Sequence, residues 1–104
     1  MLPETSDKRV QYGQRELSVV KKRKLFEKAI NSPGNVRFDE FVTLLKAFGF
    51  TLDRVRGSHH VFVHPELGEL LSIQSKQGGK AKPYQLRQFF KLVEQYNLSL
   101  NEDE

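Results

Sequence analysis

Residues 57–60, Gly-Ser-His-His, are the segment of this chain best suited to chemistry. An imidazole titrates near neutral pH, so one histidine can serve as base and as acid. Arg54 and Arg56 precede the segment and suit the binding of a phosphate beside it. A base here could take the proton of a ribose 2′-hydroxyl, and the freed oxygen would attack the adjacent phosphate. DNA lacks that hydroxyl, so this chemistry would be specific to RNA, with His59 or His60 as the base.

Two simpler roles for these histidines stay open at this point. Either side chain could be a polar strand residue that makes a hydrogen bond near a turn, which Gly57 would permit. In a regular strand His60 and His64 share one face and His59 lies on the other. His60 and His64 could therefore be metal ligands. The chain has no Cys and no carboxylate at ligand spacing, so we expect no metal and no cofactor.

The charge of the chain favours a polyanionic partner. The formal net charge is +4, but all 17 Lys and Arg lie between residues 8 and 97, with eight of the 13 acids, which gives 17 − 8 = +9 there. Such an excess suits nucleic acid first and an anionic membrane second, although scattered charge that serves solubility is an alternative. Lys76, Lys80 and Lys82 lie beside or within a glycine-containing segment, 77–82, which we expect to be a flexible basic loop. Its lysines and backbone N–H groups could contact phosphates, or the segment could be an ordinary solvated loop.

The remaining composition limits the class of protein. With no cysteine the chain has no disulfides and no thiolate nucleophile. No stretch approaches about 18 apolar residues, so we expect no membrane partner. The first 14 residues lack the apolar block of a secretory signal, and the cytoplasm is the expected location.

Apolar spacing and turn residues predict the elements that must position these side chains. Residues 1–15 lack periodicity and are expected to be flexible, and residues 16–36 form a helical extension whose helix covers 16–30. The main domain is expected over 37–98, followed by an acidic tail over 99–104. Within the domain, a helix capped by Asp39 ends at Gly49, and Pro83 begins a final helix. Strands are expected over 50–56, 60–64 and 70–75.

This order of elements predicts an α+β fold. After the extra N-terminal helix the domain reads α-β-β-β-α, which favours a three-stranded antiparallel sheet with helices packed on one face. Three strands with a helical cover are about the least that is stable alone.

Residues 38–98 resemble the HicA family, the toxin half of a bacterial toxin–antitoxin pair. The resemblance rests on the helix that ends at Gly49-Phe50, on the run Gly-Ser-His-His-Val-Phe-Val-His-Pro over 57–65, and on the third strand, basic loop and closing helix. It implies a fold like the double-stranded-RNA-binding domain, metal-independent cleavage of messenger RNA and neutralisation by a HicB-like antitoxin. In the family the histidine directly after Gly-Ser is taken as catalytic. This maps to His59, with His60 as the fallback.

The resemblance also suggests which residues would contact RNA and where this chain differs. The candidate RNA-binding residues are Arg54, Arg56, Ser58, Lys76, Lys80 and Lys82, and Gly57 would shape the turn. Family members usually carry a Pro and a second His after the third strand, whereas residues 72–77 here read Ser-Ile-Gln-Ser-Lys-Gln. Two further functions therefore stay open: an RNA-binding module that does not cut, and a protein-interaction domain that docks an acidic partner on a sheet edge or on the basic helix.

Overall fold

A computed structural model of the 104-residue chain describes residues 21–100. The predicted N-terminal segment 1–15, the first part of the predicted helix (16–20) and residues 101–104 of the predicted tail lie outside the described residues. Residues 21–31 are helical. The elements that follow are η1 (Pro33–Asn35), α2 (Phe38–Ala47), β1 (Thr51–Arg56), β2 (His59–His64), β3 (Glu69–Ile73), β4 (Ser75–Lys76), η2 (Gln77–Gly79), β5 (Lys80–Ala81) and α3 (Pro83–Gln95).

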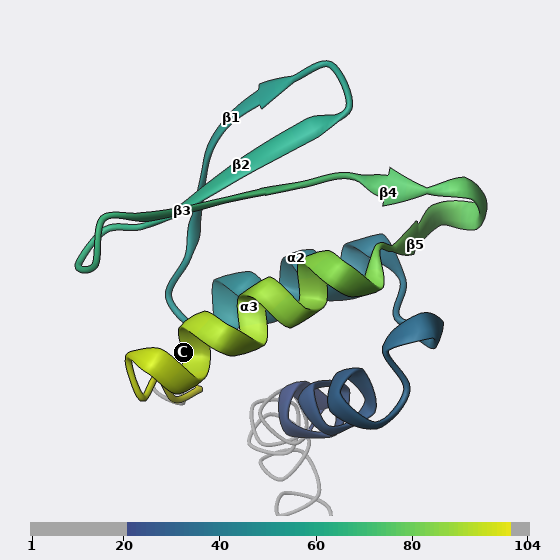
Figure 1. Ribbon diagram of the computed structural model, residues 1–104, viewed down its shortest axis with the longest axis horizontal. Helices are drawn as coiled ribbons and strands as arrows, with labels where there is room; N and C mark the ends of the chain where they lie inside the picture. Colours follow the sequence, from purple (N-terminus) through teal and green to yellow (C-terminus); the bar gives the residue numbers. More distant parts are fainter. Residues whose placement is uncertain (1–20, 101–104) are drawn as a thin grey trace, which may run out of the picture.

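The main sheet has the order β1-β2-β3 with both pairs antiparallel. Figure 1 shows α2 and α3 side by side on one face of this sheet, with the β1–β2 hairpin projecting beyond them. The predicted α+β architecture, a three-stranded antiparallel sheet with helices on one face, is confirmed. The other face of the sheet carries no element of residues 21–100 (Figure 1).

The core lies between this sheet and the helices. Its largest fully buried side chains are aromatic or branched aliphatic, and they come from every layer: Phe41, Phe50, Phe62, Phe89, Leu44, Leu45, Ile73, Leu86 and Val36. Phe89 of α3 is at the centre, with ring centroids of Phe41, Phe48, Phe50 and Phe90 at 5.4–6.2 Å. The stripe of apolar residues predicted for α2 and the one predicted for the closing helix both face this core.

The C-terminal cap of α2 is the one predicted from the sequence, whereas its N-terminal cap is not. At the C-terminus Gly49 has a φ of 97°, its N–H donates to Lys46 O, and the N–H of Phe50 donates to Leu45 O at 2.9 Å. This is the left-handed cap expected from the sequence. At the N-terminus the expected cap by Asp39 is wrong. The helix begins one residue earlier, after Arg37, whose N–H donates to Glu40 Oε1 at 2.9 Å.

Gly49 also lies against the histidine at the end of β2, which makes the position sensitive to substitution. A Cβ atom here would lie 2.8 Å from Nε2 of His64, and His64 is buried. Together with the positive φ, this contact predicts that Gly49→Ala lowers the free energy of unfolding by more than about 1 kcal/mol. Gly34→Ala is the control, since a Cβ atom at Gly34 would have no neighbour within 4 Å. Equal denaturation midpoints for the two variants would contradict this prediction.

Residues 75–81 differ from the flexible loop expected for residues 77–82. Here β4 and β5 form a short antiparallel hairpin around η2, in which Gly78 has a φ of 85°. The N–H of Ala81 donates to Val36 O at 2.9 Å, and Lys80 forms an isolated bridge with Arg37. This pairing with a segment more than 40 residues earlier orders the hairpin. The third strand accordingly ends at Ile73, and not at Ser75 as expected.

The closing helix α3 begins at Pro83 as predicted and carries a buried polar residue. Gln85 is 4% exposed, and its Oε1 accepts the backbone N–H of Gln74 at 3.1 Å. This hydrogen bond fixes the end of β3 on α3. At the other end of the helix, the hydroxyl of Tyr96 donates to Glu69. That hydrogen bond, followed by desolvation and the carboxylate charge, raises the pKa of Tyr96.

The helix over residues 21–31 packs on the domain through one aromatic side chain. The ring of Phe26 lies 4.9 Å from that of Phe48 and 5.9 Å from that of Phe90, and Ala29 is fully buried. Lys28 Nζ pairs with Glu40 of α2 at 3.1 Å. The predicted helical extension is therefore docked on the core over its described part. Within residues 21–100 no helix is long and apolar enough to cross a bilayer.

Candidate functional site

The two candidate histidines follow a tight turn between β1 and β2. Gly57 and Ser58 form a two-residue connection, and Gly57 has a φ of 58°. Because Ser58 keeps a negative φ, the connection resembles a turn that takes glycine at its first central position. Such a turn matches the twist of the flanking strands and places Arg56 directly opposite His59.

The register of the hairpin separates the basic side chains from the apolar ones. Paired residues share a face, so Arg56 lies with His59, and Arg54 lies with Val61 two residues further along the same face. This is the face that the helices leave uncovered. Val55 and His60 pair on the opposite side, toward α2. The structure therefore brings His59, Arg54 and Arg56 together on one open surface.

His59 is accessible and not committed to any internal contact. Its side chain is exposed and makes no hydrogen bond to residues 21–100. Arg56 has no acidic partner within the same range, whereas Arg54 pairs with the neighbouring Asp53. An exposed imidazole opposite this guanidinium can receive a phosphate between the two groups without displacing a contact to residues 21–100.

His60 has a different environment. It is half-buried, its ring packs edge to face on Phe38 at 5.1 Å, and its Nδ1 lies 3.4 Å from the carbonyl oxygen of Ser58. These contacts are those of a structural strand residue. Since His59 and His60 point to opposite faces, they do not form an acid–base pair on one phosphate.

His64 lies at the far end of β2 from the turn and is sealed in the protein. It is 6% exposed, its ring packs on Phe50, and its Nδ1 has no hydrogen-bond partner among the described residues. Residues 21–100 contain no group of three or more His, Cys, Asp or Glu side chains placed to hold a metal ion. Although His60 and His64 share a face, their surroundings do not add a third ligand.

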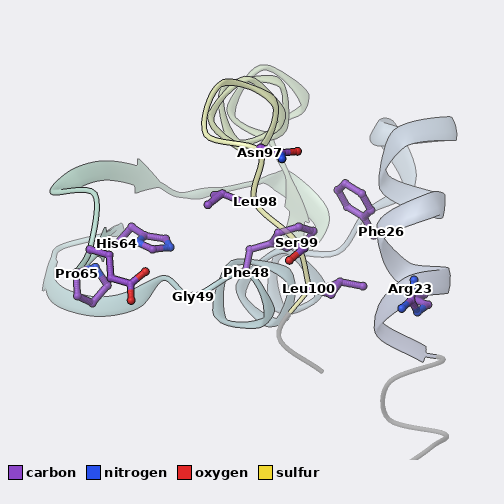
Figure 2. A pocket seen from close by; sticks show the side chains of 11 residues that line it. Arg23, Phe26, Phe48, Gly49, His64, Pro65, Asn97, Leu98, Ser99 and Leu100 are labelled. Carbon is purple, nitrogen blue, oxygen red and sulfur yellow. The ribbon is translucent and has the colours of Figure 1, made fainter. Parts of the chain in front are cut away.

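A cavity of about 990 Å³ adjoins His64 but is separate from the turn. Figure 2 shows His64 and Pro65 at one end, Arg23 and Phe26 of the N-terminal helix at the other, and Leu98 between them. None of Arg54, Arg56 or His59 lines it. This cavity is thus not the place where the candidate catalytic groups meet.

A smaller hollow of about 600 Å³ does include His59 in its lining. The rest of that lining comes from β3, from Gln74 after it and from α3, which contributes Lys91. The exposed imidazole therefore borders a depression along the β3 edge of the sheet as well as the open face that carries Arg56.

The predicted basic residues of the β4–β5 hairpin lie at the same end of the sheet as His59. His60 pairs with Ile73, so the chain that follows β3 passes beside the start of β2. In Figure 1 the β1–β2 turn projects at the top and the β4–β5 hairpin lies at the right, both away from the β2–β3 turn at the left. Lys76 is exposed, Lys80 and Lys82 are half-exposed, and none has an acidic partner within residues 21–100.

The sequence does not predict the part played by two residues near this end. Arg37 lies beside Lys80 through the long-range bridge, and its guanidinium pairs with Asp39. Gln85 holds Gln74 next to the start of β2 and so positions the strand end beside His59. No local signal marks either residue, because both act through partners distant in the sequence.

Comparison with known proteins identifies the family. A family model for the HicA toxin of bacterial toxin–antitoxin systems matches residues 38–95. Neither the curated proteins nor the solved structures contain a significant match. The matched segment runs from the first residue of α2 to the last residue of α3, so it contains the whole sheet and the Gly-Ser-His-His turn. Since this match covers 58 of the 104 residues (38 to 95 inclusive), the chain belongs to the HicA family of bacterial toxins.

Proposed function

We propose that this protein is a metal-independent endoribonuclease that cleaves messenger RNA with His59 as its catalytic base. HicA toxins are generally messenger-RNA nucleases, which supports the class of reaction. The observation that supports the residue is the position of His59, exposed on the uncovered sheet face and directly opposite Arg56. Of the described histidines, only His59 combines exposure with a neighbouring free cation.

The reaction follows from the chemistry of ribose. His59 takes the proton of the 2′-hydroxyl, and that oxygen forms a bond to the adjacent phosphorus. The bond from phosphorus to the 5′-oxygen of the next nucleotide breaks, and the leaving oxygen takes up a proton from solvent or from the imidazolium. The products are a 2′,3′-cyclic phosphate and a 5′-hydroxyl end. General-base catalysis by a positioned histidine contributes about 10²–10⁴-fold to the rate in other enzymes.

The surrounding cations supply the second part of catalysis. Arg56, which pairs with His59 across the hairpin, would stabilise the negative charge that grows on the phosphate oxygens. Arg54 on the same face, with Lys76, Lys80 and Lys82 at the same end of the sheet, would hold neighbouring phosphates, and Ser58 in the turn would donate its hydroxyl. Phosphate contacts of this kind fix the position of the strand without reading its sequence.

A HicB-like antitoxin would neutralise this activity by covering the same surface. The face that carries Arg54, Arg56 and His59 is open, and the excess of cations there suits an acidic protein. Binding of that partner would remove the imidazole from solvent and block the approach of RNA.

Cleavage of chemically altered RNA tests the proposed reaction directly. An RNA with a single 2′-deoxy nucleotide at the cut should resist cleavage there, because the nucleophile is missing. Cutting of unmodified RNA should persist in the presence of a chelator and leave cyclic phosphate ends, measured by gel and mass spectrometry. Cleavage at the deoxy position would exclude the 2′-hydroxyl as the nucleophile.

The salt dependence of binding should identify Arg56 as a phosphate contact. Arg56→Gln is expected to reduce the slope of log affinity against log salt by about 0.7 for single-stranded RNA, the value for one lost contact. Arg87→Gln is the charge-matched control, since Arg87 is exposed on α3. Affinities of both variants for RNA would be measured by fluorescence anisotropy over a salt series. Identical salt slopes for the two variants would show that Arg56 does not contact a phosphate.

A non-catalytic RNA-binding module is the second candidate. It is favoured by the lack of any hydrogen bond that would orient the His59 ring among residues 21–100. This alternative predicts the same salt-dependent binding but no cut products at any enzyme concentration.

A further inference from the structure

A basic groove lies on the molecule outside the site described above. Two adjoining hollows of about 500 and 630 Å³ share Lys22 and Thr43, and they run between the helix over 21–31 and α2. We call this surface the helix groove. Its polar lining is mostly basic and includes one acid, Glu40. The other polar residues are Lys21, Lys22, Lys24, Lys28, Thr43, Lys46 and Thr51.

Within the part of the chain that the structure describes, the positive charge of the helix groove is largely uncompensated. The one acidic residue that lines it, Glu40, accepts Lys28 Nζ at 3.1 Å and the N–H of Arg37 at 2.9 Å. Lys21, Lys22, Lys24 and Lys46 have no acidic partner within residues 21–100. These four ammonium groups on the two helices repel one another, and a polyanion in the groove would relieve that repulsion.

The apolar part of the lining favours a nucleic acid backbone over a small anion. Leu25 lines one hollow, Ala47 and Phe50 line the other, and the methylene stems of the lysines add to this surface. A ribose-phosphate chain alternates charged groups with less polar sugars. It can therefore place phosphates at the ammonium groups and sugars over the apolar lining.

The groove leads toward the candidate catalytic turn. Its second hollow ends at Thr51 and Leu52, the first residues of β1, and the last residue of that strand is Arg56, opposite His59. All six residues of β1 are exposed, and β1 is an edge of the sheet. A six-residue strand spans roughly 17 Å. A strand of RNA leaving the groove can follow this edge to the turn without crossing a described element.

We propose that the helix groove binds the backbone of the RNA substrate beyond the nucleotides at the cut. The protein would therefore favour long single-stranded RNA over short fragments. This inference rests on the proposed function and extends it, because half of the groove comes from the helix over 21–31, which precedes the segment matched by the family. The N-terminal helix would then lengthen the substrate-binding surface of a HicA domain.

The test measures binding of the full chain in a His59→Ala background, so that RNA remains intact. Lys22→Gln, Lys46→Gln and their double variant are compared with Arg87→Gln, which removes one charge from α3. Two RNAs are used: a long single strand, and a short one that can occupy only the turn. On the long RNA each groove variant should reduce the salt slope by about 0.7, and the double variant by about 1.4. Affinity of the double variant should fall about tenfold.

The outcomes separate this inference from the proposed function. Unchanged affinities of the double variant for long RNA, or an equal loss in Arg87→Gln, would overturn the inference. The inference would also be overturned if the double variant kept its affinity for RNA but no longer bound vesicles of anionic lipid. The groove would then serve to bind a membrane. An equal loss on short and long RNA would also overturn it. Failure of the proposed function appears elsewhere, as persistent cleavage by His59→Ala or as no RNA affinity in any variant.

Discussion

His59→Ala is expected to abolish RNA cleavage and to leave the fold and RNA binding nearly intact. The imidazole is the proposed base, and the loss of a positioned base lowers a rate by about 10²–10⁴-fold. The side chain is exposed and makes no hydrogen bond to residues 21–100, so the free energy of unfolding should change by less than about 0.5 kcal/mol. Cleavage of a labelled transcript and growth after induced expression would both report the loss.

His60→Phe provides the matched control for that experiment. Phenylalanine keeps an aromatic ring against Phe38 and removes only the titratable nitrogens. This variant should retain cleavage if His59 is the base. Activity in His59→Ala together with its loss in His60→Phe would transfer the catalytic role to the fallback residue. Loss in both variants with intact folding would mean that neither histidine acts alone.

Phe89→Ala is expected to have the largest effect on stability. Phe89 is fully buried, and its ring contacts four other aromatic rings from α2, α3 and the segment between α2 and β1. Truncation of a buried Phe to Ala costs about 3–5 kcal/mol, from lost burial and from the cavity that remains. Because the total stability of a small domain is about 5–15 kcal/mol, the variant should be partly unfolded near 37 °C.

Ile30→Ala is the control for the Phe89 variant. Ile30 is 51% exposed on the helix over 21–31, and alanine is the better helix former. Its free energy of unfolding should stay within about 0.5 kcal/mol of the parent protein. Urea denaturation followed by circular dichroism would compare the two. If Phe89→Ala lowered the free energy of unfolding no more than Ile30→Ala does, the aromatic cluster would not be what holds the helices to the sheet.

Local sequence determined the long helices, the three strands of the main sheet and several of their ends. Apolar spacing in α2 and α3 predicts which face is buried, since the helical period is a property of the chain itself. Gly49 ends α2 and Pro83 begins α3 as expected. Each of these ends depends on a property of one residue type, the tolerance of glycine for positive φ and the missing N–H of proline. The expectation that Asp39 caps α2 is wrong, because the helix begins at Phe38 and Glu40 in its first turn accepts the N–H of Arg37, the residue before the helix.

Only the tertiary structure decided which histidine faces solvent and which basic side chains gather around it. Side chains alternate between the two faces of any extended strand, so His59 and His60 must lie on opposite faces of β2. Which of those faces is covered depends on where the helices pack. The β4–β5 hairpin is ordered by its pairing with residues 36–37, and the helix groove needs two helices that meet through Phe26 and Phe48. Such contacts join residues far apart in the chain. They contribute to the free energy of folding only once the core has brought those residues together.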